Sequence, residues 1–183
     1  MIIGITGTDG AGKGTAVRYL VDQKGFAYYS SRSFILEFIE KEGLPTTRNQ
    51  MRLTANALRK EHGNAFVIKQ AFEKARVNGQ ENVVIESLRA VAEGEYLKEE
   101  GGILLAVDAE QKLRYARVQE RRSESDQVTF EEFTAHEELE KNDPDPHGMQ
   151  KGRVMEMADY TIMNDGTLAE LHEQVEDFLA RIV

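Results

Sequence analysis

The sequence predicts one α/β domain in which a parallel sheet of five strands lies between two layers of helices. Short apolar runs alternate with longer stretches of helical character. The runs lack polar alternation, which is typical of strands buried on both faces. Glycine or proline ends several helical stretches. Strand and helix repeated in this order indicate a parallel sheet with right-handed crossovers.

The strands and helix boundaries can be assigned in order. Four strongly apolar strands and a weaker one are expected at residues 2–5, 26–29 (the weaker one), 83–85, 103–107 and 160–163. Helix stops are expected at Gly25, Gly43, Gly79 and Gly101. Three threonines, each followed three residues later by Gln or Glu, have the spacing of a capping box and predict helix starts: Thr47, Thr129 and Thr167.

Composition narrows the classes of protein that fit. The chain has 183 residues, of which 40% are hydrophobic, so one domain with a sizeable core is expected. The net charge of −9 argues against binding to nucleic acid or to an anionic membrane. No cysteine is present, which excludes disulfides and thiolate chemistry. No apolar run approaches the ~18 residues of a membrane span, and a cytoplasmic protein is expected.

A glycine-rich loop between the first strand and the first helix carries the strongest functional signal. It reads Gly7-Thr8-Asp9-Gly10-Ala11-Gly12-Lys13-Gly14-Thr15. Glycines let backbone N–H groups turn inward onto phosphate oxygens, and the following helix adds its positive end. Lys13 supplies a charge for the β- and γ-phosphates. The expected ATP contacts are Gly7, Asp9, Gly10, Ala11, Gly12, Lys13, Gly14 and Thr15. The alternative is an ordinary glycine-rich turn.

Two oxygen donors are candidates for holding Mg²⁺ with ATP. The generic pattern G-x-x-x-x-G-K-[ST] places a hydroxyl directly after the lysine. Here Gly14 stands in that place and Thr15 follows, so Thr15, or water alone, is expected to serve the metal. Glu86 ends an apolar strand at the edge where open α/β sheets bind ligands, and it is expected to hold water on the ion. The alternative for Glu86 is a solvated charge.

Arginines are unusually clustered for an acidic protein. Residues 108–122 read as a helix with Asp108 as N-cap, which places four arginines on one face: Arg114, Arg117, Arg121 and Arg122. Clustered like charges suggest an anionic ligand such as a migrating phosphoryl group. A looser stripe, Arg48, Arg52 and Arg59, follows Thr47, with Met51, Ala55 and Leu58 expected to pack inward. In each case a solvated helix face is the alternative.

Several of these motifs resemble those of a known family. The loop resembles that of adenylate kinases, and Gly7-x-Asp9-Gly10-x-Gly12-Lys13 also resembles thymidylate kinases. Glu86-Ser87-Leu88-Arg89 looks like the D-G-x-x-R segment of adenylate kinases, whose arginine clamps the acceptor phosphate; Glu replaces Asp and Ser replaces Gly here. Residues 117–122 resemble the R-x-x-x-R-R segment that opens the adenylate kinase lid. By that resemblance Arg117 would lie against the ATP base and Arg121 would meet the phosphates.

Over nearly its whole length, the chain resembles an archaeal-type group of P-loop kinase-like proteins related to adenylate and dephospho-CoA kinases. Besides the loop, the signs are Glu86-x-x-Arg89, Arg121-Arg122-Ser123-x-x-Asp126, and Ala158-Asp159-Tyr160 followed by Asn164-x-Gly166-Thr167. The resemblance implies a three-layer P-loop fold with a short helical lid at about 123–157, an acceptor-binding region at about 31–79 and a core at about 1–30, 80–122 and 158–183. A space-filling helical hairpin is the alternative to the lid.

The resemblance also implies a function, transfer of the γ-phosphoryl group of ATP to a nucleoside monophosphate. Lys13, Arg89 and Arg121 would be catalytic, and Gly166 would lie at the adenine edge. Asp9, Ser31, Arg32 and Arg89 would bind the acceptor. The partners would be ATP and a small nucleotide, while the oligomeric state is left open. Two alternatives remain: dephospho-CoA kinase-like transfer to a ribose hydroxyl with Asp9 as base, and a non-catalytic ATP-binding switch or scaffold.

Overall fold

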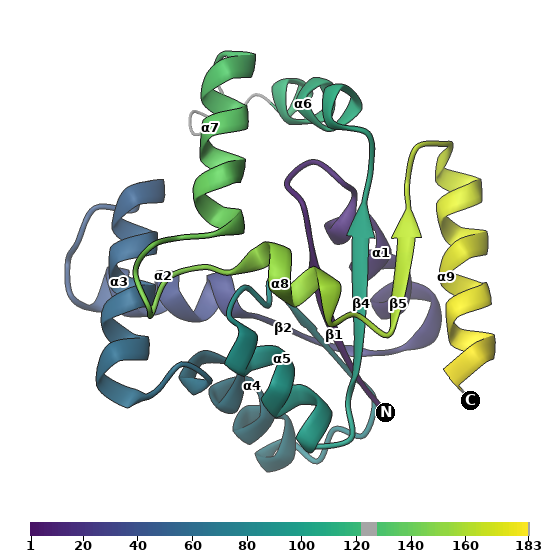
Figure 1. The fold of residues 1–183 in the computed structure, drawn as a ribbon. Helices are drawn as coiled ribbons and strands as arrows, with labels where there is room; N and C mark the ends of the chain where they lie inside the picture. Colours follow the sequence, from purple (N-terminus) through teal and green to yellow (C-terminus); the bar gives the residue numbers. More distant parts are fainter. Residues whose placement is uncertain (122–127, 183) are drawn as a thin grey trace.

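The computed structural model describes residues 1–121 and 128–182 and has three layers, with helices on both faces of a central sheet (Figure 1). The sheet order is β2-β3-β1-β4-β5, and all neighbouring strands are parallel. The strands are β1 (Ile2–Gly7), β2 (Ala27–Ser30), β3 (Val83–Glu86), β4 (Ile103–Asp108) and β5 (Tyr160–Met163). The predicted fold class and all five predicted strands, the weaker one included, are confirmed.

The helices follow the strands in the expected alternation. They are α1 (Lys13–Lys24), α2 (Ser31–Lys41), α3 (Arg48–His62), α4 (Phe66–Val77), α5 (Val91–Glu99), α6 (Gln111–Glu120), α7 (Phe130–Lys141), α8 (Lys151–Glu156) and α9 (Leu168–Ile182). Helices α1 and α9 cover one face of the sheet, and α4, α5 and α8 cover the other (Figure 1). The carboxyl ends of the strands point toward α6 and α7.

The two faces have separate cores because side chains alternate along each strand. In β3, Val84 packs with α1 and α9, whereas Val83 and Ile85 pack with α4 and α5. Helix α8 adds Val154 to this second cluster, so part of the region predicted as a lid belongs to the core. Helices α2 and α3 lie beside the sheet and share a small cluster of their own around Ile39.

Most predicted helix boundaries agree with the structure. Thr129 and Thr167 form capping boxes with the glutamates three residues later. Thr47 caps α3 by accepting a hydrogen bond from the Gln50 N–H, but the Gln50 amide donates to Thr54 rather than completing the box. The N-cap predicted at Asp108 is wrong. Glu110 caps α6 by accepting from the Leu113 N–H, which also lowers the pKa of Glu110.

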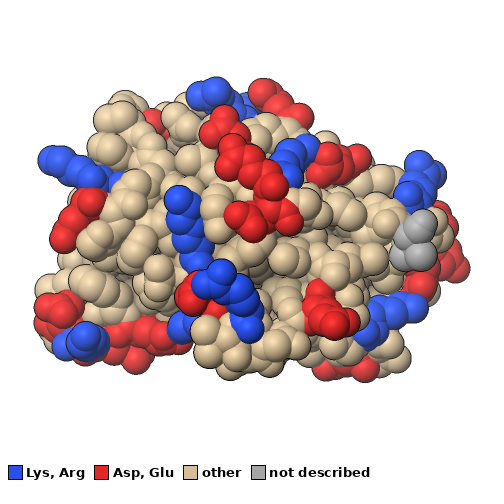
Figure 2. All heavy atoms as spheres, turned by 90° about the horizontal axis from the view of Figure 1, so that it is seen from below, with Lys and Arg blue, Asp and Glu red and all other residues tan. Residues whose placement is uncertain are grey.

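The face at the amino ends of the strands carries mixed charge. In Figure 2, lysines and arginines lie beside aspartates and glutamates without a large area of one sign. Within residues 1–121 and 128–182, no helix combines the length and the hydrophobicity that a bilayer span requires. The glycine-rich loop lies at the carboxyl edge of the sheet, where open α/β sheets bind their ligands.

Candidate nucleotide-binding site

The glycine-rich loop connects the central strand β1 to α1, and two of its glycines, Gly7 and Gly12, are required by space as well as by backbone conformation. Gly7 has φ of 134°, and a Cβ there would lie 2.0 Å from the Val107 carbonyl oxygen of β4. Gly12 has φ of 98°, and a Cβ there would lie 2.3 Å from Asn164 Nδ2. Larger residues at either position would push the loop away from β4 and β5, so the loop's shape depends on these glycines.

The amino end of α1 is left open for an anion. Gly12 is the N-cap of α1 and supplies no side chain to the first N–H groups of the helix. These groups point out of the helix end and carry the positive end of its dipole. A phosphate group satisfies both requirements at once.

Lys13 lies in the first turn of α1 and folds back over the loop. Its ammonium donates to the Gly7 carbonyl at 2.9 Å and to the Thr8 carbonyl at 2.7 Å. The pKa of Lys13 is lowered to about 8, mainly by burial and in smaller part by the Lys151 and Arg89 cations, while the Asp9 and Glu86 carboxylates oppose this shift. A buried ammonium beside other cations has a strong electrostatic preference for an incoming anion.

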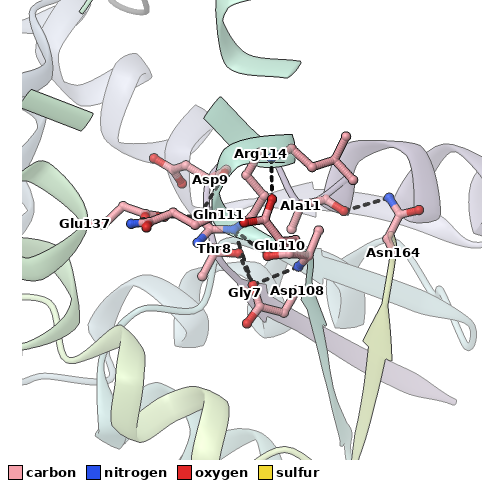
Figure 3. Close-up of polar contacts among 12 residues, drawn as sticks. Gly7, Thr8, Asp9, Ala11, Asp108, Glu110, Gln111, Arg114, Glu137 and Asn164 are labelled. Atoms are coloured by element: carbon pink, nitrogen blue, oxygen red, sulfur yellow. Dashed lines mark hydrogen bonds and ion pairs between the residues drawn. The ribbon is translucent and has the colours of Figure 1, made fainter. Parts of the chain in front are cut away.

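Neighbouring elements brace the loop from behind (Figure 3). The Thr8 hydroxyl donates to Asp108 Oδ1 at 2.5 Å, at the end of β4. Arg114 Nη1 donates to the Asp9 carbonyl at 3.3 Å and to Glu137 of α7. The Asn164 amide, after β5, donates to the Ala11 carbonyl at 2.8 Å. The loop therefore keeps its shape through contacts with β4, α6, α7 and the end of β5.

The predicted arginine face is divided by these contacts. Arg114 is buried and paired with Glu137 and Asp108, so its charge is compensated by carboxylates within the protein. Arg117 donates to the Asn164 carbonyl at 2.8 Å and lies beside the turn that contains Gly166. Arg121 is exposed at the C-cap of α6. Arg122, like the Ser123 and Asp126 of the motif, lies outside the described residues.

The segment after β3 contains a residue with a left-handed backbone. Ser87, in the glycine position of D-G-x-x-R, has φ of 75°, and its N–H and that of Leu88 both donate to the Ile5 carbonyl. The Arg89 N–H is held by the buried Glu93 carboxylate, and its guanidinium reaches the Met149 sulfur at 3.4 Å. Glu86 accepts from the Tyr28 hydroxyl at 2.7 Å, and burial together with this contact raises the pKa of Tyr28 to about 12. The charges of Arg89 and Glu86 both influence the pKa of Lys13, so the segment lies close to the loop.

The residues of the predicted acceptor-binding region differ in burial, and two arginines of α3 form ion pairs within the protein. Ser31 is buried in the first turn of α2 and lines a hollow of about 250 Å³ between α2 and α4, whereas Arg32 is exposed on the same turn. Arg59, expected on a surface stripe, is 2% exposed and paired with Glu93 at 3.3 Å. Arg52 pairs with Asp143 at 3.1 Å. The side chain of Arg48 lies outside what the structure describes. Helix α3 thus holds the loop that follows α7.

Three residues at the site have functional positions that sequence reasoning did not assign: Lys151, Glu140 and Asn164. Lys151 Nζ lies 3.2 Å from Asp9 Oδ1 and also contacts Glu140. No motif surrounds Lys151 or Glu140, so nothing in the sequence distinguishes them from surface charges. Asn164 belongs to the motif Asn164-x-Gly166-Thr167. Its contact with the loop depends on how close β5 lies to the loop in space, and this cannot be read from the sequence.

For the predicted metal ligands, the donor chemistry fits Mg²⁺. The Thr15 hydroxyl and the Glu86 carboxylate are the hard oxygen donors that this ion prefers. Thr15 lies half-buried in the first turn of α1, and Glu86 lies close enough to Lys13 to influence its pKa. Within the described ranges, no group of three or more His, Asp and Glu side chains is arranged to hold a metal by itself.

Comparison with known proteins shows the family to which the chain belongs. Residues 3–142 match the AAA domain family, so the chain belongs to that family of P-loop proteins and has a kinase-like fold. It is 30% identical to a UPF0200 protein of Pyrococcus horikoshii, covering 100% of this chain and 98% of that protein. It is 32% identical to a UPF0200 protein of Sulfurisphaera tokodaii, covering 100% and 97%. The chain is thus a member of the UPF0200 family, which confirms the resemblance to an archaeal group of P-loop kinase-like proteins.

Solved structures support the fold. A shikimate kinase from Bacteroides thetaiotaomicron superimposes with a TM-score of 0.64 at 15% identity, covering 98% of both chains. The protein TT1252 from Thermus thermophilus superimposes with a TM-score of 0.65 at 22% identity, covering 100% of this chain and 98% of that one. At these identities the comparison establishes the shared architecture.

Proposed function

We propose that this protein is a phosphotransferase that moves the γ-phosphoryl group of ATP to a nucleoside monophosphate. The observation that carries the proposal is that two cations, Lys13 and Arg89, lie near each other at the carboxyl edge of the sheet. Lys13 is buried in the phosphate loop with a pKa of about 8, and Arg89 approaches it from the end of β3. A buried cation with a second, half-buried cation nearby favours a ligand with several negative charges, as a nucleotide acceptor beside ATP would supply.

The chemistry requires positioning and charge, without a covalent intermediate. The bond between the γ-phosphorus and the β–γ bridging oxygen of ATP breaks, and a bond to an oxygen of the acceptor phosphate forms, so that ADP and a nucleoside diphosphate leave. Lys13 would stabilise the charge on the leaving side, and Arg89 would clamp the acceptor phosphate. Arg121 would add positive charge over the phosphates, and Arg117 and Gly166 would lie beside the base.

Mg²⁺ bound with ATP would neutralise charge on the β- and γ-phosphates. Thr15 and Glu86 would hold it, directly or through water. Ser31, Arg32 and Asp9 would complete the acceptor side, with the region at about 31–79 contributing its walls. Within the segment at about 123–157, α7 and the loop after it lie outside the cores of the sheet and would act as the lid that keeps water from the γ-phosphate.

An acceptor panel tests the proposal. The protein is incubated with ATP and Mg²⁺ and each of the nucleoside monophosphates, dephospho-CoA or shikimate, and ADP release is measured. We expect release with at least one monophosphate and none with Lys13→Met, whose fold is checked by circular dichroism. Release only with dephospho-CoA or shikimate would show a hydroxyl acceptor. ATP-dependent thermal stabilisation without ADP release for any acceptor would show a non-catalytic ATP-binding protein.

A further inference from the structure

Lys151 begins α8 and is a buried cation that none of the proposed steps uses. Its side chain is only 8% exposed, and its ammonium holds two carboxylates, Asp9 of the phosphate loop at 3.2 Å and Glu140 of α7. Glu140 is itself buried. Since a buried ammonium is costly unless carboxylates or other acceptors surround it, this arrangement defines a specific position for Lys151 rather than a surface charge.

The carboxylate that Lys151 holds is also within reach of Lys13. Asp9 Oδ1 lies 3.9 Å from Lys13 Nζ, so one oxygen lies between two ammonium groups. The charged groups around Lys13 come from the loop, β3, the segment after it and α8: Asp9, Glu86, Arg89 and Lys151. An uncompensated Asp9 would repel an incoming phosphate and would compete with it for Lys13.

We propose that Lys151 is a positioning residue that neutralises Asp9 and so leaves Lys13 available to the phosphates of the nucleotide. The inference rests on the proposed function, because it requires that phosphates bind at this loop. Lys151 acts through Asp9 and does not touch the nucleotide. Its two existing carboxylate partners account for its burial, whereas a direct phosphate contact would require it to leave at least one of them.

Lys151 also connects the loop to α7, because it contacts both Asp9 and Glu140. Glu137 and Glu140 lie three residues apart on one face of α7, and they hold Arg114 and Lys151 respectively. Both of these cations also contact Asp9, one at its carbonyl and one at its carboxylate. The charge balance of the glycine-rich loop therefore depends on the packing of α7, and Lys151 connects the Asp9 side chain to this helix.

A double-mutant cycle tests the inference, with Mg-ATP affinity measured by calorimetry on the full chain. The four corners are wild type, Lys151→Met, Asp9→Asn and the double variant. We expect Lys151→Met to weaken binding at least tenfold, and Asp9→Asn to restore it in the double variant to within about threefold of the Asp9→Asn protein. Lys151→Arg, which keeps the charge, is expected to bind close to wild type, and the exposed Lys60→Met serves as a matched control.

The outcomes separate this inference from the proposed function. If wild type binds Mg-ATP but Lys151→Met weakens it equally with and without the Asp9→Asn substitution, Lys151 contacts the phosphates directly and the positioning role is wrong. If Lys151→Met binds as wild type does, Lys151 has no role in binding. If wild type itself does not bind, both fail. Because Lys151→Met leaves Glu140 buried without this partner, Glu140→Gln is added to all four corners if that variant does not fold.

Discussion

The depressed pKa of Lys13 predicts a specific dependence of stability on pH. In the unfolded chain Lys13 keeps its proton up to about pH 10.5, whereas in the folded protein it loses it near 8. Between these values the unfolded state binds more protons, so the contribution of Lys13 to the free energy of unfolding rises with pH. At about 1.36 kcal/mol per unit, the rise between pH 8 and 10 is about 2–3 kcal/mol. The side chain is only 13% exposed, so solvent screening reduces this little.

The assay is urea unfolding of wild type and Lys13→Met without nucleotide at pH 7, 8, 9 and 10. Groups that titrate in both proteins cancel in the difference, so the stability of wild type relative to the variant should be nearly constant up to pH 7 and rise above 8. With Mg-ATP present the rise should shrink in wild type, because bound phosphates favour the charged ammonium. A difference that stays flat, or that falls with pH, would refute the argument that burial dominates at Lys13.

Substitutions at three further positions, Ser87, Gly14 and Glu93, test other parts of the site. Ser87 has a left-handed backbone, so Ser87→Gly should keep stability within about 0.5 kcal/mol, whereas Ser87→Val should lose more than about 1 kcal/mol in thermal unfolding. Gly14 has open space around it, so Gly14→Ser should raise stability in urea unfolding by about 0.5 kcal/mol through helix propensity. Glu93 holds Arg59 and two N–H groups, so Glu93→Gln should cost about 3 kcal/mol in urea unfolding, while Glu95→Gln, on the exposed side of α5, should not change stability.

The features readable from the sequence are those set by near neighbours in the chain. The apolar runs identified the strands because a strand buried on both faces needs no partner information to be recognised. The glycine-rich loop was legible because its conformation and its lysine lie within nine consecutive residues. Ser87 stands where the family motif has a glycine, and it has a positive φ, a conformation that glycine adopts most easily.

The features that sequence reasoning missed depend on distances between elements. Asp108 has the residue type of an N-cap, but its carboxylate accepts a hydrogen bond from the Thr8 hydroxyl. The N-cap of α6 is Glu110, which accepts from the Leu113 N–H. Arg114 shares a helix face with Arg117, yet α7 packs on it and supplies a counter-charge from Glu137. Such contacts are set by how α6 and α7 pack, which local patterns do not specify.

Asn164 has a consequence for how the two ends of a bound nucleotide would influence each other. Its amide holds the phosphate loop at Ala11, its carbonyl accepts from Arg117, and its N–H donates to the Asp108 carbonyl. One residue thus joins the loop that faces the phosphates to the turn and helix proposed to face the base. A displacement at the base end would be transmitted to the phosphate end through rigid contacts. The binding free energy of ATP should then differ from the sum of the binding free energies of adenosine and inorganic triphosphate. This difference should shrink when Asn164 is replaced.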